Sequence, residues 1–177
     1  DNKILFDISL LPKMMLDCIQ FGTIPFAILA RHGFIAITIL QSLKNVGIIT
    51  KEESESFMTS IQTVASDLVD DINALQLGKL KKTQFQERYG HLRPGTYDIM
   101  SLRYDQMIGL SEGGPLELPK HKKKIFSFSK EQNQKIDMLL KKNGFNVFKV
   151  KDLENYIREA IIGREYSKFV FTRSISD

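Results

Sequence analysis

Cysteine and tryptophan are the scarcest residues in this sequence of 177 residues, which holds one cysteine, Cys18, and no tryptophan. A lone cysteine cannot form an intramolecular disulfide or a cysteine-based zinc site. A reducing compartment is then the simpler assumption, and we expect a cytoplasmic protein. Cys18 lies in the apolar stretch MMLDCIQFG, where we expect a buried thiol that packs as a small hydrophobic side chain.

The sequence also lacks the common signatures of nucleotide binding and nucleophilic catalysis. It contains no Walker-type phosphate loop, no dinucleotide fingerprint and no nucleophile elbow. Its three histidines, His32, His91 and His121, stand far apart, and none has the spacing of a metal site. We therefore expect this chain to hold no metal and no cofactor of its own.

The sequence also argues against a membrane-spanning protein. The most apolar stretch, FGTIPFAILARHGFIAITIL, is interrupted near its middle by Arg31 and His32. A spanning helix needs about 20 residues that are almost free of charge, and a helix buried in a globular core explains the stretch better. We expect a core helix in which His32 has a packing role, and no association with a membrane.

The overall composition is that of a soluble globular protein, with 42% hydrophobic and 26% charged residues. The length is sufficient for one domain with a proper core. The net charge of +4 permits an anionic partner but does not require one. Because the chain starts without methionine and ends inside what reads as a continuing helix, we expect one domain over residues 1–177, a fragment of a longer protein.

Hydrophobic periodicity predicts an all-α fold, a bundle of about five to six helices with a long irregular polar insertion. Two capping boxes, Thr50 with Glu53 and Ser129 with Gln132, each predict the start of a helix. The sequence after Thr50 predicts a single helix that Gly78 ends. Its apolar stripe has helical spacing throughout and consists of Phe57, Ile61, Val64, Leu68, Ile72 and Leu75.

Start and stop signals predict the other elements. We expect a short helix over 10–20 that ends at Phe21 and Gly22, and a central helix over 25–46, apolar nearly all round and stopped by Gly47. Further predictions are a short turn with Phe85 and Tyr89, a helix from 129 closed by Gly144, and a last helix capped by Asp152, with an inward face of Leu153, Tyr156, Ile157, Ala160 and Ile161. Residues 110–124, with two glycines and two prolines, predict a flexible loop. The segments KIFSF and FNVFKV form at most a minor β-hairpin.

One irregular stretch concentrates the polar and titratable side chains. In YGHLRPGTYDIMSLRYD, Pro94 disfavours helix at Arg93, and the following glycine permits a sharp turn. The arginine forks fit a carboxylate or a phosphate, and histidine is the side chain type that can change its charge near neutral pH. The candidate site residues of this stretch are His91, Arg93, Thr96, Tyr97, Asp98, Arg103 and Tyr104.

A structural explanation of the same residues stays open, because arginine, aspartate and histidine also form networks that only fasten a loop to a bundle. Two other clusters have the same two interpretations. Arg164, Lys168 and Arg173 in REYSKFVFTR are either ligand-binding or part of a solvated helix end. The basic run PKHKKK is either a contact for phosphate or nucleic acid or a solvated loop. Because it lacks interleaved aromatic residues, we expect no nucleic-acid partner.

At ERYGHLRPGTYDIMSLRYD the sequence resembles the phosphoenolpyruvate-utilising, dikinase-type phosphotransferases, which include phosphoenolpyruvate synthase-like proteins and rifampicin phosphotransferase. The resemblance extends through LLPKMMLDCIQFGTIPFAILARHGFIA and IREAIIGREYSKFVFTRSISD, and so covers most of the chain. With His91 followed by LRPGT, the chain is most similar to the branch of capsule glutamine kinases.

The resemblance implies that this chain is the central helical region between an ATP-grasp-like domain and a swivelling phosphohistidine domain. The parent enzyme would use ATP and Mg²⁺ bound to another domain, and pass a phosphoryl group through a phosphohistidine to a small acceptor, such as an amino acid amide or pyruvate. None of the three histidines here has the setting of that phosphohistidine, so we expect the fragment alone to be inactive. Arg93 and Arg103 would hold a carboxylate or the phosphoryl group, and His91 would position or deprotonate the acceptor.

Overall fold

The computed structural model describes residues 8–94, 100–107 and 125–176 of the chain. All regular elements in these ranges are helices, which confirms the predicted all-α bundle. The segments KIFSF and FNVFKV form no strand in their described parts, and the predicted loop over 110–124 lies outside the described residues.

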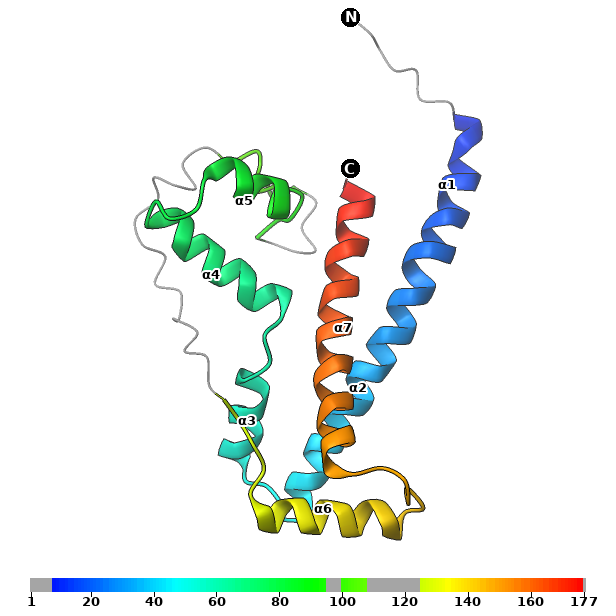
Figure 1. The fold of residues 1–177 in the computed structure, drawn as a ribbon. Coiled ribbons are helices and arrows are strands. Elements are labelled where there is room, and N and C mark those ends of the chain that lie inside the picture. Colours follow the sequence, from blue (N-terminus) through cyan, green and yellow to red (C-terminus); the bar gives the residue numbers. More distant parts are fainter. Residues whose placement is uncertain (1–7, 95–99, 108–124, 177) are drawn as a thin grey trace, which may run out of the picture.

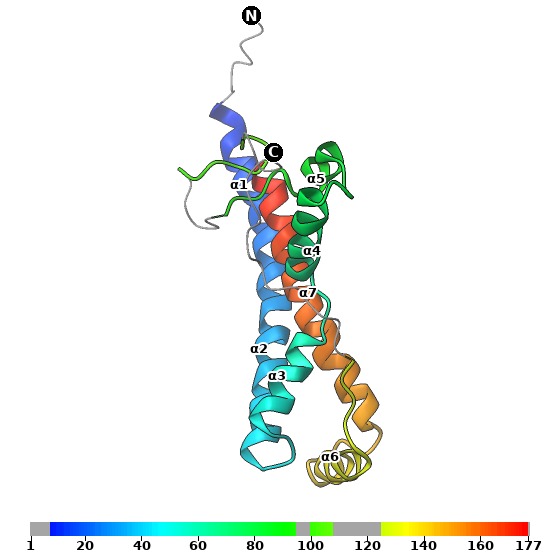
Figure 2. The same cartoon turned by 90° about the vertical axis from the view of Figure 1, so that its left-hand side faces the viewer.

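A long N-terminal rod and a long C-terminal helix form the frame of the molecule (Figure 1). The rod begins with the 3-10 turn Ile8–Leu10 and continues through α1 (Leu11–Asp17), a π-helical segment (Cys18–Thr23) and α2 (Ile24–Asn45). Helix α7 (Val150–Ser176) runs antiparallel beside it. Figure 2 shows the resulting narrow, elongated shape.

The predicted helix break at Phe21 and Gly22 is wrong, because the chain passes through these residues in the π-helical segment. Gly22 serves close packing: a Cβ atom at this position would overlap the ring of Phe171 on α7. That ring also stacks on Phe26, with 6.3 Å between the centroids. Cys18 lies in the same segment and is half-buried, which differs from the buried thiol that we expected.

The single helix predicted after Thr50 is two helices, α3 (Lys51–Thr59) and α4 (Val64–Gln76). The break is local in origin, because Thr63 starts α4 with a capping box of its own, whose second member is Ser66. The apolar stripe did not reveal the break because its spacing continues through it. The stripe is divided between two cores: Phe57 and Ile61 belong to one, and the other four residues belong to the second.

The two predicted capping boxes are confirmed, and they are joined to each other. Ser129 starts α6 (Lys130–Lys142), and its hydroxyl accepts a hydrogen bond from the Gln132 backbone N–H at 3.2 Å. The Gln132 amide also donates to the carboxylate of Glu53 at 3.0 Å and to the Ile48 carbonyl at 3.1 Å. The N-termini of α3 and α6 are therefore fastened together, although 79 residues separate Glu53 from Gln132.

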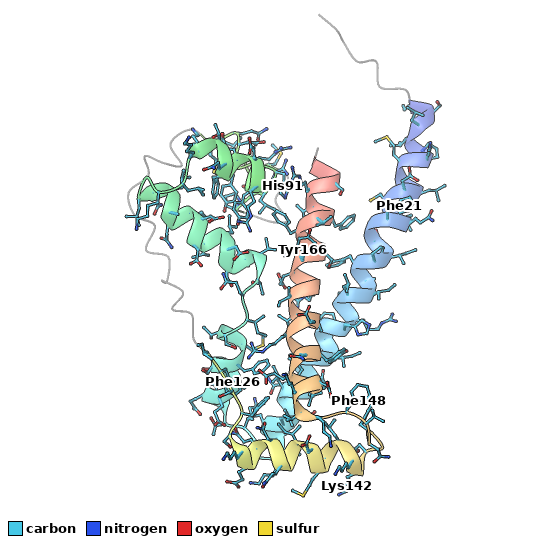
Figure 3. All side chains as sticks on the ribbon, in the orientation of Figure 1. Phe21, His91, Phe126, Lys142, Phe148 and Tyr166 are labelled. Carbon is cyan, nitrogen blue, oxygen red and sulfur yellow. The ribbon has the colours of Figure 1, made fainter. Side chains whose placement is uncertain are left out.

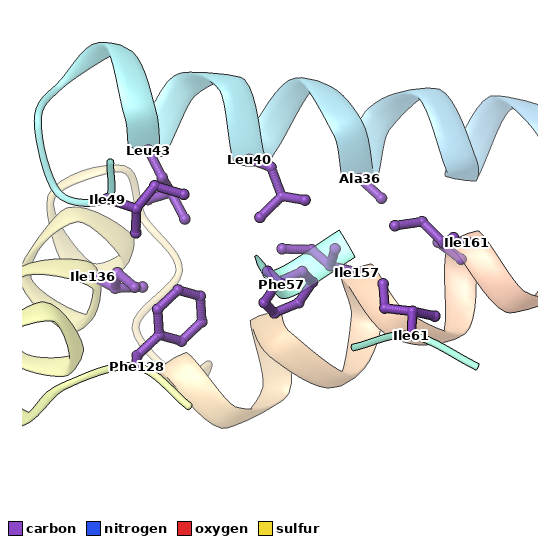
Figure 4. Close-up of a cluster of buried hydrophobic side chains, with 11 residues drawn as sticks. Ala36, Leu40, Leu43, Ile49, Phe57, Ile61, Phe128, Ile136, Ile157 and Ile161 are labelled. Atoms are coloured by element: carbon purple, nitrogen blue, oxygen red, sulfur yellow. The ribbon is translucent and has the colours of Figure 1, made fainter. Parts of the chain in front are cut away.

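The first core lies between α2, α3, α6 and the N-terminal half of α7 (Figure 4). Phe57 is completely buried at its centre, 5.2 Å from Phe126 and 5.8 Å from Phe128 between ring centroids. The guanidinium of Arg158 covers the Phe57 ring at 4.5 Å. The inward face predicted for the last helix is confirmed, since Ile157, Ala160 and Ile161 are buried, and Leu153 and Tyr156 are partly buried against the same core.

The second core is smaller and lies between α4 and α5 (Lys82–Tyr89). Its buried members are Ile72, Leu75, Phe85 and Tyr89, with Leu92 and Tyr104 packed against them. We call residues 64–94 and 100–107 the α4–α5 unit. Phe169 of α7 also packs on this core, so the unit rests on the C-terminal half of α7.

Helix α2 is less central than its composition predicts. One face is buried through Gly33, Ala36, Leu40 and Leu43, while Phe34 and Ile35 on other faces are exposed. His32 is exposed and so is not a core residue, but it contacts α7, since its Nδ1 lies 3.0 Å from the Tyr156 hydroxyl.

Among the described residues, one helix, the rod Ile8–Asn45, is long and apolar enough to cross a membrane by length and composition alone. Its α2 half lies against α7, whose Arg164, Glu165 and Lys168 are costly to place in hydrocarbon. The absence of a membrane partner stays a prediction.

Candidate functional site

A small cavity of about 220 Å³ lies between the α4–α5 unit and α7. We call it the seam pocket, because one wall belongs to the unit and the other to α7. The unit supplies part of α4, the segment after α5 and Tyr104, and α7 supplies four side chains. The complete lining is Val64, Ala65, Leu68, His91, Leu92, Arg93, Pro94, Tyr104, Glu165, Lys168, Phe169 and Thr172.

The backbone after α5 is folded back on itself, which fixes the first wall. The N–H of Tyr104 donates to the Leu92 carbonyl at 2.9 Å, and the N–H of Asp105 donates to the Gly90 carbonyl at 3.2 Å. Gly90 is the residue that allows this, because a Cβ atom there would overlap the Gln86 carbonyl oxygen and approach the Asp105 side chain. The two ends of the irregular stretch are therefore held side by side.

His91 occupies the inner part of this arrangement and is only 4% exposed. Figure 3 shows it between α5 and the upper part of α7. Its ring meets the ring of Phe169 at 4.9 Å between centroids, in an edge-on geometry of 66°. The imidazole is thus held in one place by packing, with the seam pocket beside it.

Two cationic side chains reach the pocket from opposite walls. Arg93 is anchored by its Nε, which donates to the Ser101 carbonyl at 2.9 Å, and its side chain lines the pocket. Lys168 comes from α7, next to Glu165. Tyr104 completes this polar set, and burial raises the pKa of its hydroxyl, so it stays a neutral hydrogen-bonding group at physiological pH.

Four of the candidate residues, His91, Arg93, Tyr104 and Lys168, line this one pocket, although Lys168 belongs to a cluster that the sequence analysis treated separately. It places the other described candidates elsewhere. Arg103 makes a two-pronged ion pair with Asp105, at 3.2 Å from Nε and 2.7 Å from the terminal nitrogen, and does not line the pocket. This ion pair is a contact of the kind that the structural explanation expects, in which polar side chains only fasten a loop.

Arg164 and Arg173 also lie away from the pocket lining. The Arg164 guanidinium lies 5.6 Å from the ring of Phe34, and its side chain packs on Gly33, so it faces α2. Arg173 is exposed near the end of α7. The remaining candidates, Thr96, Tyr97 and Asp98, fall outside the described residues.

Sequence reasoning missed two kinds of site residue. Glu165 and Thr172 line the pocket with Lys168, and their spacing of three and four residues on one helix was a signal that could have found them. It also missed the acidic face of α4, which holds the end of α5. Asp71 accepts hydrogen bonds from Tyr89 at 2.9 Å and from Arg88 at 3.0 Å.

The contact with Asp71 changes the chemistry of Tyr89. Burial, the hydrogen bond to Asp71 and the negative charge of that carboxylate together raise the pKa of the Tyr89 hydroxyl well above its usual range. Arg88 also pairs with Asp67 at 3.3 Å. This network lies behind the seam pocket and holds α5 on α4, so it positions the segment that carries His91.

A second, larger cavity of about 850 Å³ lies between α2, α6 and the start of α7. It is an open groove, and its lining is almost entirely apolar. Phe34, Ile35, Leu140, Phe145 and Phe148 are among its walls. No cluster of three or more histidine, cysteine, aspartate or glutamate side chains that could hold a metal occurs within the described ranges.

No protein-family model matches the chain, and no match was found among the curated proteins or the solved structures.

Proposed function

We propose that this chain is the acceptor-side helical domain of an ATP-dependent phosphotransferase of the phosphoenolpyruvate synthase-like type, and that the seam pocket binds its small acceptor. The observation that supports this most is the convergence of Arg93 and Lys168 beside the buried ring of His91. In that enzyme, ATP, Mg²⁺ and the phosphohistidine belong to the flanking domains.

The size and charge of the pocket suit a small anionic group. A volume of about 220 Å³ is below the range of roughly 300–1,000 Å³ that is usual for drug-sized ligands. An arginine fork forms strong, directed hydrogen bonds with carboxylate or phosphate oxygens, and lysine adds a point charge. Cations in this position also stabilise the charge that spreads over a phosphoryl group during transfer.

His91 has the position expected of a group that orients the acceptor or accepts its proton. It borders the pocket, and its ring orientation is fixed by Phe169. A base must lie within hydrogen-bonding reach of the proton that it removes. Arg93 and His91 both line the seam pocket, so an acceptor whose anionic end is held by Arg93 can present its other end to His91.

The test is acceptor phosphorylation by the parent enzyme that contains this chain. Arg93→Gln will lower kcat/KM for the acceptor by about 10- to 100-fold, the usual cost of losing hydrogen bonds to a charged group, and the melting temperature will change little. Arg173→Gln, on an exposed part of α7, is the matched control and will keep normal activity. Normal kcat/KM in a folded Arg93→Gln enzyme would remove the acceptor-site proposal.

A purely structural or interaction module is the second candidate, and a specific observation favours it. Arg103 is occupied by Asp105, and the Nε of Arg93 is occupied by the Ser101 carbonyl, so much of the polar stretch fastens its own loop. The long exposed apolar surface of α1, with no buried residue, also suits a partner. This candidate predicts that Arg93→Gln lowers the free energy of unfolding and leaves acceptor phosphorylation by the folded enzyme unchanged.

A further inference from the structure

We propose that the large groove between α2, α6 and the start of α7 is a docking site for an amphipathic helix with an apolar face and acidic flanks, supplied from outside these 177 residues. We call this surface the α2 groove. It lies on the N-terminal half of α7, whereas the seam pocket lies on the C-terminal half. The inference therefore concerns a second site and does not depend on the proposed function.

The α2 groove has the length and spacing of a helix-binding surface. Its α2 wall runs from Arg31 to Val46, and the lining residues in that range recur at alternating steps of three and one, the pattern of a single helix face. At about 1.5 Å per residue, this wall is about 22 Å long, or roughly four helical turns. Side chains of α6 and of the start of α7 form the other walls. A helix docks in such a groove through apolar anchors at positions i, i+3, i+4 and i+7.

The walls of the groove present large apolar side chains to solvent. Phe34 and Val46 come from α2, and Phe145 and Phe148 come from the turn between α6 and α7. Each of these four side chains is more than half exposed. Apolar side chains that gather in one hollow of this size, about 850 Å³, mark an interaction site more often than a bare surface.

The polar side chains on these walls are already hydrogen-bonded. The hydroxyl of Thr38 donates to the Phe34 carbonyl at 2.9 Å, and the hydroxyl of Ser42 donates to the Thr38 carbonyl at 2.8 Å. Asp152 is the one carboxylate among the described lining residues, and it accepts a hydrogen bond from the Lys149 backbone N–H at 2.9 Å. Burial of apolar surface is therefore what the groove offers an occupant.

The charge around the groove favours an acidic partner. Between Met138 and Lys151, the segment that joins α6 to α7 contains four lysines and no acidic residue. These lysines are exposed, and no ion pair joins them to another described residue. Figure 3 shows Lys142 and Phe148 at the end of the molecule where α6 lies. Arg31 adds a cation at the other end of the α2 wall, and it too has no ion pair within the described ranges.

Acidic residues beside the apolar face of a docked helix would meet these cations at both ends of the groove, which gives the partner its orientation. Two other occupants fit less well. A second copy of this chain would bring the same cations together, which disfavours self-association through this face. A lipid surface is flat, whereas the groove is concave, so a bilayer would reach its rim but not its base.

The experiment uses the 177-residue chain and a synthetic peptide of about 18 residues, with leucine along one helical face and glutamate on both flanks. Calorimetry measures its affinity. One control peptide has the same composition with the leucines redistributed so that the stripe is lost, and the other has glutamine in place of glutamate. We expect saturable binding of one striped peptide per chain and no measurable binding of the redistributed one. The glutamine peptide should bind about 10-fold more weakly, since exposed ion pairs are individually weak and four together give about that factor.

Variants of the chain assign the binding to the groove. Ile35→Glu places a carboxylate on the α2 wall, at a residue that is 43% exposed, and should abolish binding. Ile19→Glu is the matched control, because Ile19 is 47% exposed but does not line the groove, and it should keep the affinity. Phe148→Ala removes an aromatic anchor and should raise the Kd about 5-fold or more, with little change in melting temperature.

Four results would overturn the docking site. Equal binding of the redistributed peptide would reduce the effect to charge attraction. No binding of the striped peptide at concentrations up to about 1 mM would remove the helix site. Binding that Ile35→Glu and Phe148→Ala both leave intact would place the peptide elsewhere. Sedimentation of the chain alone gives the fourth result: a dimer that Ile35→Glu dissociates, and that the striped peptide does not, would assign the groove to a second copy.

Discussion

Replacement of Phe57 by alanine removes the side chain at the centre of the first core. The side chain is completely buried, with two aromatic neighbours, Phe126 and Phe128, and the Arg158 guanidinium over its face. Truncation of a buried phenylalanine costs about 3–5 kcal/mol through lost burial and the cavity that remains. Each aromatic pair is worth about 0.5–1.5 kcal/mol beyond its buried area. We therefore expect Phe57→Ala to lower the free energy of unfolding by about 4 kcal/mol or more.

The assay is urea denaturation monitored by the helical circular dichroism signal. With an m-value of about 2 kcal/mol/M, the loss lowers the midpoint by about 2 M. Phe148→Ala is the matched control, since that ring is 54% exposed, and it should change the free energy by less than about 1 kcal/mol. A Phe57→Ala loss below about 1.5 kcal/mol, or a control loss of equal size, would refute the described packing of the first core.

Two further predictions concern the packing of the N-terminal rod against α7 and the stability of the protein at alkaline pH. Gly22→Ala will lower the melting temperature, because the added methyl group overlaps the Phe171 ring and overpacking of this kind costs about 1–3 kcal/mol; an unchanged melting curve would contradict the close approach of the two helices. The pKa of Tyr89 is raised in the folded state, so the unfolded chain loses this proton first and stability falls as the pH rises above about 10. Tyr89→Phe will reduce this loss of stability, which is measured as the difference in the free energy of unfolding by urea between pH 8 and pH 11. An equally large loss in the variant would show that other groups cause it.

Local signals in the sequence predicted much of the fold. The capping boxes at Thr50 and Ser129 were found because their partners lie three residues away. The stops at Gly78 and Gly144 were found because both residues have a left-handed backbone, with φ of 67° and 86°. Signals of this kind need no knowledge of what packs against the helix.

The errors arose where a distant contact decides the local structure. Gly22 reads as a helix stop, but its role is to admit Phe171, a residue 149 positions further along the chain. The apolar stripe from Phe57 to Leu75 reads as one helix face, because helical spacing does not show that two different cores receive it. Such contacts are set by tertiary packing, which a single sequence does not reveal.

The candidate site was predicted only in part, because tertiary packing brings some of its residues together. His91 and Arg93 are neighbours in the chain, so their shared position followed from the sequence. Lys168 joins them only because α7 packs against the unit. Arg103 carries the same fork as Arg93 but has Asp105 two residues away, and this local pairing directs it to a structural contact.

Calorimetric titration of the 177-residue chain with inorganic phosphate, at matched ionic strength, tests the central claim most directly. We expect saturable binding that Arg93→Gln weakens by about 10- to 100-fold, since a charge-assisted contact is lost. Arg103→Gln should leave the affinity within about threefold, because Arg103 does not line the pocket. No binding by the wild-type chain, or equal losses in the two variants, would contradict an anion site formed by Arg93 and Lys168.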